Sequence, residues 1–288
     1  MRTGLKRRAS ALTAWFGGVL LVACASGLPP GEPPEDPVVQ AIQESAWARQ
    51  TRIRFVAEGK SWQHKTFGDR KPTLYQPTFQ AGRPAIHALS IAGNSSLRQA
   101  VDPPPGVAVD QLRFSWLVLS LNEAADLRDN DIDDAVARVM LGFDGDRAAR
   151  FSARDHMLSE LAQLVTGEPL PYATLIYVWD NRYPVGTVIA NPHTDRIRHL
   201  VVESGPARLG RWVDQERDVQ ADFSHAFGEK PGPLRSVGVM SDANNTGASV
   251  EAWFGPLQLG FSDRSSASTT QPMVTTDTRS SAVKRQQP

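Results

Sequence analysis

One short run carries the clearest structural signal in this chain: Leu175-Ile176-Tyr177-Val178-Trp179. Every side chain in it is apolar, which is typical of a central strand that is covered on both faces. Apolar and polar residues alternate at 112–116 and at 137–143, as they do in half-buried strands. Turn residues separate these runs from further predicted strands at 196–203, 211–219, 233–240 and 249–260.

Two helices interrupt the strands. The first begins after Ser152, a good N-cap residue with Asp155 three positions later, and ends at Gly167. The second spans 218–227 and ends at Gly228. Many short strands with few helices predict an all-β fold: an antiparallel two-sheet sandwich or jelly roll with one or two short helices inserted.

The first 23 residues (1–23) have the features of an export signal peptide. Basic residues precede an apolar core at 11–23, which is too short to span a membrane. The segment Leu21-Val22-Ala23-Cys24 is a lipobox, and Cys24 is the only cysteine in the chain. We therefore expect Cys24 to be lipidated and to hold the protein on a membrane of the bacterial cell envelope. Ala25 favours the outer membrane, with the protein facing the periplasm.

Composition divides the remaining chain into three parts. Residues 24–44 contain five prolines, which favours an extended tether behind the lipidated cysteine. Residues 45–261 are long enough for one β-sandwich domain, and one cysteine cannot form an internal disulfide, so a packed core has to stabilise it. Residues 262–288 are rich in Ser, Thr and Gln and are predicted to be a disordered tail.

Net charge limits the partners. The chain has 31 basic and 31 acidic residues, and loss of the four basic residues of the signal peptide leaves 27 against 31, a net charge of −4. Nucleic-acid binding needs a basic surface, so no nucleic-acid partner is expected.

Several motifs occur in one order along the chain. They begin with Tyr177-Val178-Trp179-Asp180-Asn181-Arg182-Tyr183-Pro184-Val185-Gly186-Thr187 and continue at 196–198, 210–213, 216–219, 221–223, 240–247 and 252–255. Through them the chain resembles the bacterial domain of unknown function 3047 family (DUF3047) over about residues 50–261, here in a lipoprotein context. The resemblance implies no activity. The chain departs from the family at Ala243, where an acidic residue is usual, and in the segment 150–170.

The first candidate ligand site is Trp179-Asp180-Asn181, at the end of the central strand. A sugar-binding surface needs an aromatic ring that stacks on the sugar and polar groups that bind its hydroxyls. The alternative is that Trp179 belongs to the core and that Asp180 and Asn181 form an Asx turn.

The second candidate is the segment 242–247, in which Asp242, Asn244 and Asn245 would complete the ligand-binding rim. Asp242, Asn244 and Thr246 match the first positions of a calcium loop, so a structural calcium ion is the one candidate cofactor. Trp253 stands where such a loop has its bidentate Glu, and the alternative is a tight turn.

No catalytic residue is predicted, because the chain has no Gly-x-Ser-x-Gly, phosphate-loop or His-Glu-x-x-His motif. The acidic segment 129–134 is interpreted as a solvated loop, and His193 and His199 as surface residues. Asp180, Glu203 and Glu251 are the carboxylates that would have to meet across a sheet in a glycan hydrolase.

We therefore expect a membrane-anchored envelope lipoprotein with a non-catalytic module that binds a glycan or another envelope ligand. Two alternatives stay open. A glycan hydrolase or lyase would have a deep cleft with two carboxylates about 5–9 Å apart. A structural or assembly lipoprotein would instead present a broad exposed apolar patch to protein partners.

Overall fold

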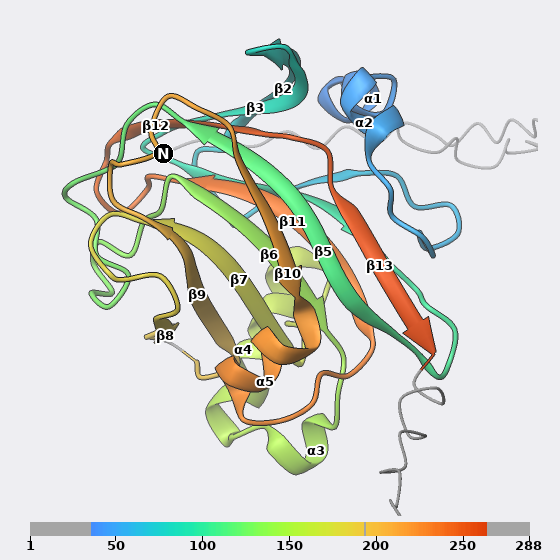
Figure 1. Ribbon diagram of the computed structural model, residues 1–288. Coiled ribbons are helices and arrows are strands. Elements are labelled where there is room, and N and C mark those ends of the chain that lie inside the picture. The colour runs from blue at the N-terminus through green and yellow to red at the C-terminus, as the bar shows by residue number, and fades with distance from the viewer. Residues whose placement is uncertain (1–35, 193, 264–288) are drawn as a thin grey trace, which may run out of the picture. The chain divides into compact units, whose positions relative to one another are not determined.

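The computed structural model describes residues 36–192 and 194–263, and Figure 1 shows them in colour. The expected signal peptide, the lipidation site Cys24 and the tail after residue 263 lie outside these residues. The described part is built mainly of strands arranged in two sheets, as the alternating sequence pattern predicts.

One sheet has seven strands in the order β1-β4-β11-β6-β7-β9-β8. These strands are β1 (Gln63–Thr66), β4 (Asn94–Ala100), β6 (Ala137–Phe143), β7 (Ala173–Asp180), β8 (Val188–Ala190), β9 (Ile197–Ser204) and β11 (Leu234–Asp242). Neighbouring strands are antiparallel except β7 and β9, which run parallel. The apolar run that ends at Trp179 is the greater part of β7, a central strand as predicted.

The second sheet has the order β10-β5-β12-β3-β2, and β13 also pairs with β5. Its strands are β2 (Leu74–Gln80), β3 (Arg83–Ile91), β5 (Val107–Val118), β10 (Val213–Asp218), β12 (Ser249–Phe254) and β13 (Gln258–Asp263). All of its strand pairs are antiparallel. The predicted strand at 249–260 is therefore two strands, separated at Gly255–Leu257.

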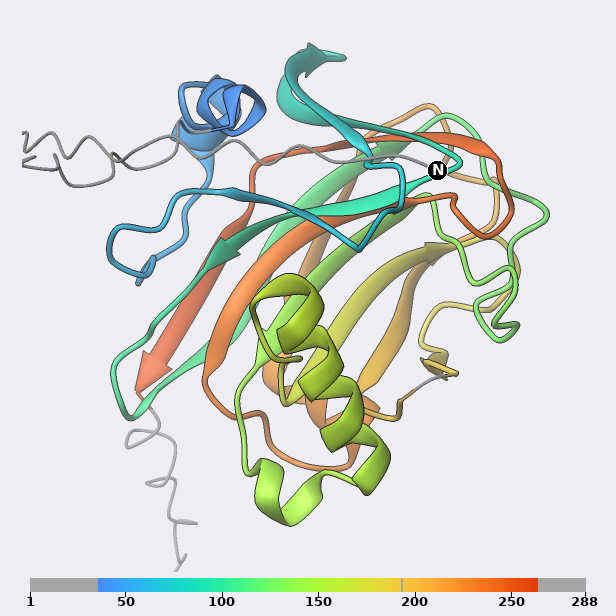
Figure 2. The ribbon, with the colours of Figure 1, turned by 180° about the vertical axis from the view of Figure 1, so that it is seen from behind.

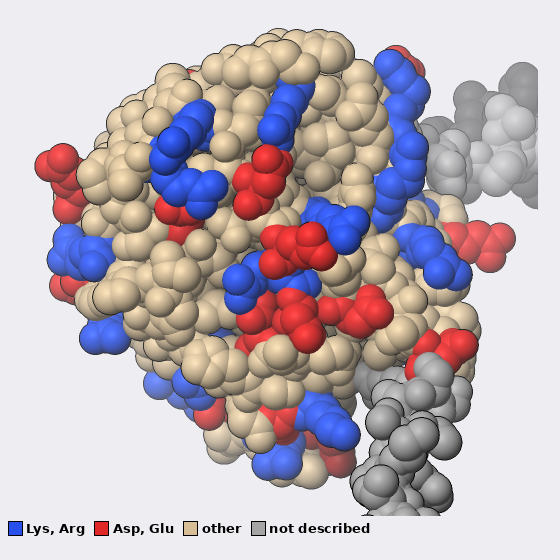
Figure 3. All heavy atoms as spheres, in the orientation of Figure 1, with Lys and Arg blue, Asp and Glu red and all other residues tan. Residues whose placement is uncertain are grey.

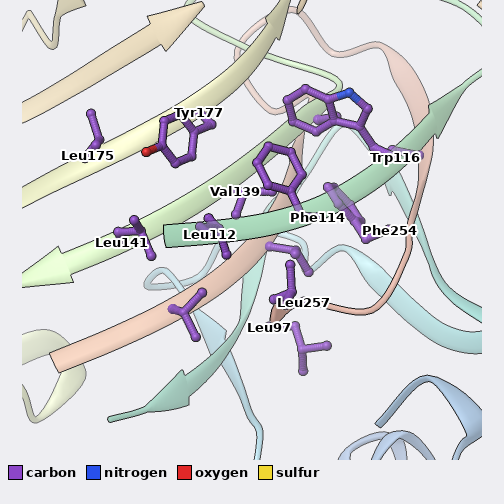
Figure 4. Close-up of a cluster of buried hydrophobic side chains, with 14 of the residues drawn as sticks. Leu97, Leu112, Phe114, Trp116, Val139, Leu141, Leu175, Tyr177, Phe254 and Leu257 are labelled. Atoms are coloured by element: carbon purple, nitrogen blue, oxygen red, sulfur yellow. The ribbon is translucent and has the colours of Figure 1, made fainter. Parts of the chain in front are cut away.

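The two sheets enclose one hydrophobic core, because every second residue of each strand points inward. Figure 4 shows Phe114 and Trp116 of β5 facing Tyr177 and Val139 of the other sheet. The rings of Phe114 and Tyr177 stack with centroids 5.9 Å apart. This packing confirms the two-sheet sandwich.

Five helices occur within 36–263: α1 (Pro37–Gln43), α2 (Ala46–Gln50), α3 (Arg147–Arg150), α4 (Ala153–Thr166) and α5 (Val219–Phe227). The two helices expected from the sequence are α4 and α5. Ser152 and Asp155 form the capping box of α4, and Gly167 ends the helix in the left-handed conformation, as the sequence predicts.

The expected tether at 24–44 is wrong at its end. Residues 37–43 form α1 rather than extended chain, and Val39 and Ile42 are buried in the core. Asp36 caps this helix and Pro37 occupies its first turn, a position where proline fits without loss of a hydrogen bond. The folded body therefore begins several residues before residue 45.

Charge is evenly mixed on the face shown in Figure 3, where basic and acidic side chains alternate. On the six-stranded sheet, Arg113 pairs with Glu216 at 3.0 Å and Arg83 with Asp214 at 2.5 Å. Among the described residues no helix has the length and apolar character needed to cross a membrane.

A candidate ligand-binding groove

A groove of about 400 Å³ lies on the outer face of the seven-stranded sheet. The two-residue period of the strands creates its floor: in β6, Val139 and Leu141 point into the core, while Arg138, Met140 and Gly142 line the groove. Strands β4, β11, β7 and β9 contribute outward residues in register with these. The groove is therefore a direct product of the sheet's pairing.

Two glycines occupy the middle of this floor. A Cβ atom on Gly238 of β11 would stand 2.7 Å from the backbone oxygen of Leu97, and one on Gly142 would stand 2.5 Å from Ser236 Oγ. Neither position has room for a side chain. Both positions therefore favour glycine.

One end of the floor holds a buried ion pair. Arg138 and Asp242 are both almost fully buried and lie 3.3 Å apart, and Arg138 also donates to the backbone oxygen of Asp133. Burial, reinforced by the nearby carboxyl of Asp134, raises the pKa of Asp242 to about 7, although the charge of Arg138 acts against this. Asp242 is therefore only partly ionised near neutral pH.

His199 of β9 lies on the same floor and is 1% exposed. Burial lowers the pKa of its imidazole to about 3, the charge of Arg138 acts in the same direction, and the Ile189 backbone opposes both. The ring is therefore neutral at physiological pH. The prediction that His199 is a surface residue is wrong, and His193 lies outside the described residues.

Four buried polar atoms of the floor lack a hydrogen-bond partner within the described part of the chain. They are Asn94 Oδ1, Arg138 Nε and both ring nitrogens of His199, although the Ile189 backbone lies near the His199 ring. Buried polar atoms in folded proteins are nearly always paired, so unpaired ones call for an explanation. All three residues line the groove.

The rim combines a fixed ion cluster with one aromatic ring. Glu168, in the loop after α4, accepts hydrogen bonds from Lys65 of β1 at 2.9 Å and from Arg98 of β4. Burial acts to raise the pKa of Glu168, but these two cations hold it below its ordinary value. Phe67 is the aromatic residue of the groove lining.

The predicted rim at 242–247 is part of this groove, since Asp242, Asn244 and Asn245 line it. The segment is also a turn, with Gly247 at a φ of 70°. The buried carboxylate of Asp134 holds the turn by accepting from the backbone N–H of Asn245 at 3.1 Å and of Thr246 at 2.8 Å. The interpretation of 129–134 as a solvated loop is therefore wrong for Asp134.

The suggested calcium site uses side chains that already have other partners. Thr246 donates to Asp134, and Asp242 pairs with Arg138. No group of three or more His, Cys, Asp or Glu residues is arranged to hold a metal ion in the described ranges.

The predicted site at Trp179-Asp180-Asn181 is wrong as a ligand surface. Trp179 is 1% exposed, and its indole N–H donates to the Gly205 backbone oxygen at 3.1 Å. Asp180 accepts from the backbone N–H of Arg182 at 2.7 Å, which is an Asx turn. Asn181 donates to the backbone oxygens of Asn122 and Ala125. Through these hydrogen bonds the three residues hold the loop that follows β7.

The three carboxylates considered for hydrolysis do not form one site. Glu203 pairs with Arg208 at 2.9 Å, and Glu251 lies on the other sheet, where it pairs with His87 at 3.0 Å. The groove has a different set of charged residues. One feature of the sequence indicates it: Arg138 interrupts the apolar strand 135–143. Phe67 and Glu168 carry no such sign, because they reach the groove only through tertiary packing.

Fold and site together define a β-sandwich protein with a groove on the outer face of one sheet. Residues 60–258 match the model of the protein family of unknown function DUF3047, and the chain belongs to this family.

A search of curated proteins finds no match. Among solved structures, the chain is similar to the xyloglucanase domain of NopAA, a type three effector from Sinorhizobium fredii, in complex with cellobiose. The identity is 10%, the TM-score is 0.37, and the alignment covers 72% of this chain and 96% of that one. A loop-swap mutant of Xyn11A from Necallimastix patriciarum is 11% identical with a TM-score of 0.33, over 72% of this chain and 98% of that one.

Proposed function

We propose that this protein is a non-catalytic ligand-binding module whose groove over the seven-stranded sheet binds a glycan of the cell envelope. The observation that carries the proposal is the set of unpaired buried atoms on Asn94, Arg138 and His199, which share one cavity. Leaving such atoms unpaired costs about 1–3 kcal/mol each, and a bound ligand would recover that cost.

The chemistry of the groove favours a polyhydroxyl ligand. A sugar hydroxyl both donates and accepts, so it matches a neutral imidazole, which offers one donor and one acceptor. Asn244 and Asn245 add amide groups, and Phe67 supplies a ring for stacking on an apolar sugar face. The aromatic ring and the polar groups that were expected together at Trp179 are thus found in the groove, where Phe67 supplies the ring.

The place of action is also part of the proposal. The export signal and the lipobox at Cys24 favour a lipid anchor in the bacterial envelope, on the periplasmic side of the outer membrane. A protein held there is surrounded by envelope glycans.

The test is isothermal titration with soluble fragments of peptidoglycan and with oligosaccharides of the lipopolysaccharide core. We expect saturable binding that weakens about tenfold in His199→Phe, which removes both ring nitrogens and keeps a ring of similar size. The matched control is Asp214→Asn, an exposed carboxylate on the other sheet, which should bind as the wild type does. Equal binding by His199→Phe and the wild type would refute the site.

One observation favours a second candidate function, the cleavage of a glycan by hydrolysis or by a lyase reaction. A carboxyl with a pKa near neutrality is suited to general acid catalysis, and that of Asp242 is raised to about 7 by burial. The titrated mixtures are therefore also assayed for new reducing ends or unsaturated products. Product that forms with the wild type but not with Asp242→Asn would favour the enzyme over the binding module.

A further inference from the structure

The groove changes character along its length. Around Asn94, Arg138 and Asp242 its surface is polar and charged. Farther along the same strands apolar residues become more frequent, although Thr174 and Ser236 also line the floor there. The apolar residues there are Met140, Ile176, Ile197, Leu170, Pro169 and Pro171. A ligand made only of hydroxyls would leave these apolar side chains without a matching partner.

The apolar end is covered by the loop that follows α4. A Cβ atom on Gly142 of the floor would lie 3.3 Å from Pro171 Cγ, which places this proline directly over the floor. The loop is held there by the hydrogen bonds of Glu168 to Lys65 and Arg98. The loop therefore forms an ordered wall at the apolar end of the groove.

Helix α4 extends this wall. Figure 2 shows α4 in front of the seven-stranded sheet, and Ala162 of α4 lines the groove. Leu158 lies four residues before Ala162 and Val165 lies three residues after it, so the three share one side of the helix. Leu161 flanks them on the outer side. Leu161 is 55% exposed and Val165 is 58% exposed. An apolar strip thus leads from the groove onto the open flank of the helix.

We propose that the ligand of the groove is an amphiphile, a glycan that carries an alkyl or acyl chain. The sugar occupies the polar end, and the chain runs along the apolar end and onto the Leu161–Val165 flank of α4. This inference rests on the proposed glycan binding and adds the class of ligand. Leu158 and Val165 neighbour Ala162, which lines the groove, so a single molecule with both kinds of surface covers both.

The experiment compares methyl β-glucoside with octyl β-glucoside by titration calorimetry, with octyl glucoside kept below its critical micelle concentration. Each buried methylene group strengthens binding about fourfold, so burial of a few predicts octyl glucoside binding at least tenfold tighter. In the double variant Leu161→Gln/Val165→Gln this gain should shrink by about tenfold, while methyl glucoside binding stays unchanged. Both side chains are exposed, so the fold should tolerate the change.

The matched control is Leu164→Gln. Leu164 is 83% exposed on the same helix but lies on the side away from Ala162, so this variant should keep the full octyl gain. Equal affinities for the two glucosides in the wild type would overturn the amphiphile and leave glycan binding intact. An octyl gain with no response to His199→Phe would support the alkyl site and count against the sugar site. An octyl gain that survives in the double variant would overturn the role of α4.

Discussion

Arg138 and Asp242 form a buried ion pair, and buried ion pairs contribute little to stability. Burying two charges has a desolvation cost that their attraction offsets only with good geometry, and here they lie 3.3 Å apart while Arg138 Nε lacks a partner among the described residues. With the pKa of Asp242 near 7, the guanidinium is only partly compensated at neutral pH. An arginine in this state offers a ligand a strong donor, which is consistent with a binding role for the groove.

The titration of Asp242 gives a prediction for stability. Its pKa rises from 3.8 to about 7 on folding, so its stabilising effect is complete below about pH 4 and is lost as the pH rises through 7. The variant Asp242→Asn lacks this titration. Between pH 5 and pH 8 the unfolding free energy of the wild type should therefore fall by about 1–3 kcal/mol more than that of the variant. Urea unfolding at both pH values measures the difference.

His199 does not disturb this comparison. Its pKa falls from 6.5 to about 3 on folding, so the stability it contributes is present above about pH 6.5 and is lost as the pH falls toward 3, in the variant and the wild type alike. The control is Asp214→Asn, whose carboxylate is exposed. Parallel stability curves for Asp242→Asn and the wild type would contradict the raised pKa of Asp242.

At the scale of elements, α4 is held mainly by its ends. The capping box of Ser152 and Asp155 satisfies the first backbone N–H groups, and Asp155 also accepts from Thr194 Oγ1 at 2.6 Å. Much of its apolar side is exposed, so packing contributes less to this helix than to α5, which buries Val219 and Phe223. The position of the groove wall therefore depends on a local cap.

Replacing Ser152 with Ala should loosen α4 without unfolding the sandwich. Loss of an N-cap side chain costs about 1 kcal/mol, and we expect amide hydrogen exchange in the first turns of α4 to speed up about fivefold. The matched control is Ser224→Ala, an exposed serine inside α5, which should leave exchange in α4 unchanged. If exchange in α4 is the same in Ser152→Ala as in the wild type, the cap does not hold the helix.

The sequence predicted those elements whose signal is local. Strand β6 matches its predicted range, 137–143, and the N-cap and C-cap of α4 fall on the predicted residues. Strands β1 to β4 give no clear local signal because their faces are not cleanly polar or apolar: β4 buries Asn94, Ser95, Ser96 and Leu97 together. Burial of that kind depends on the neighbouring strands β1 and β11, and single-sequence periodicity does not report it.

The candidate site could be predicted only in part for the same reason. Asp242, Asn244 and Asn245 were found because a turn rich in Asp and Asn stands out in any sequence. Trp179 was placed wrongly because a strand that is apolar on both faces does not tell which of its residues meet the second sheet. Its partner is Trp116, with ring centroids 6.0 Å apart, and that contact joins segments far apart in the chain.

At the scale of the whole molecule, the early start of the folded body shortens the expected tether. Eleven residues, 25–35, separate the lipobox cysteine from Asp36, and at about 3.1 Å per residue they reach about 35 Å, against about 60 Å for the predicted tether. With the lipid anchor proposed at Cys24, the body would lie close to the membrane surface.

Cys24→Ala tests the anchor directly. The variant should appear in the soluble envelope fraction or remain as the uncleaved precursor, because no acyl chain can be attached. Fractionation and intact-mass measurement of the native protein and the variant give the answer. A variant that stays with membranes at the mature mass would contradict lipidation at Cys24.

The seven-stranded sheet ends on two very short strands, the four residues of β1 and the three residues of β8. An edge that short offers few free backbone groups to a strand from another molecule. In the other sheet, Pro77 in the edge strand β2 and the charged side chains of β10 have the same effect. The edges of both sheets thus offer little to a strand of another copy, which counts against edge-to-edge joining into fibrils.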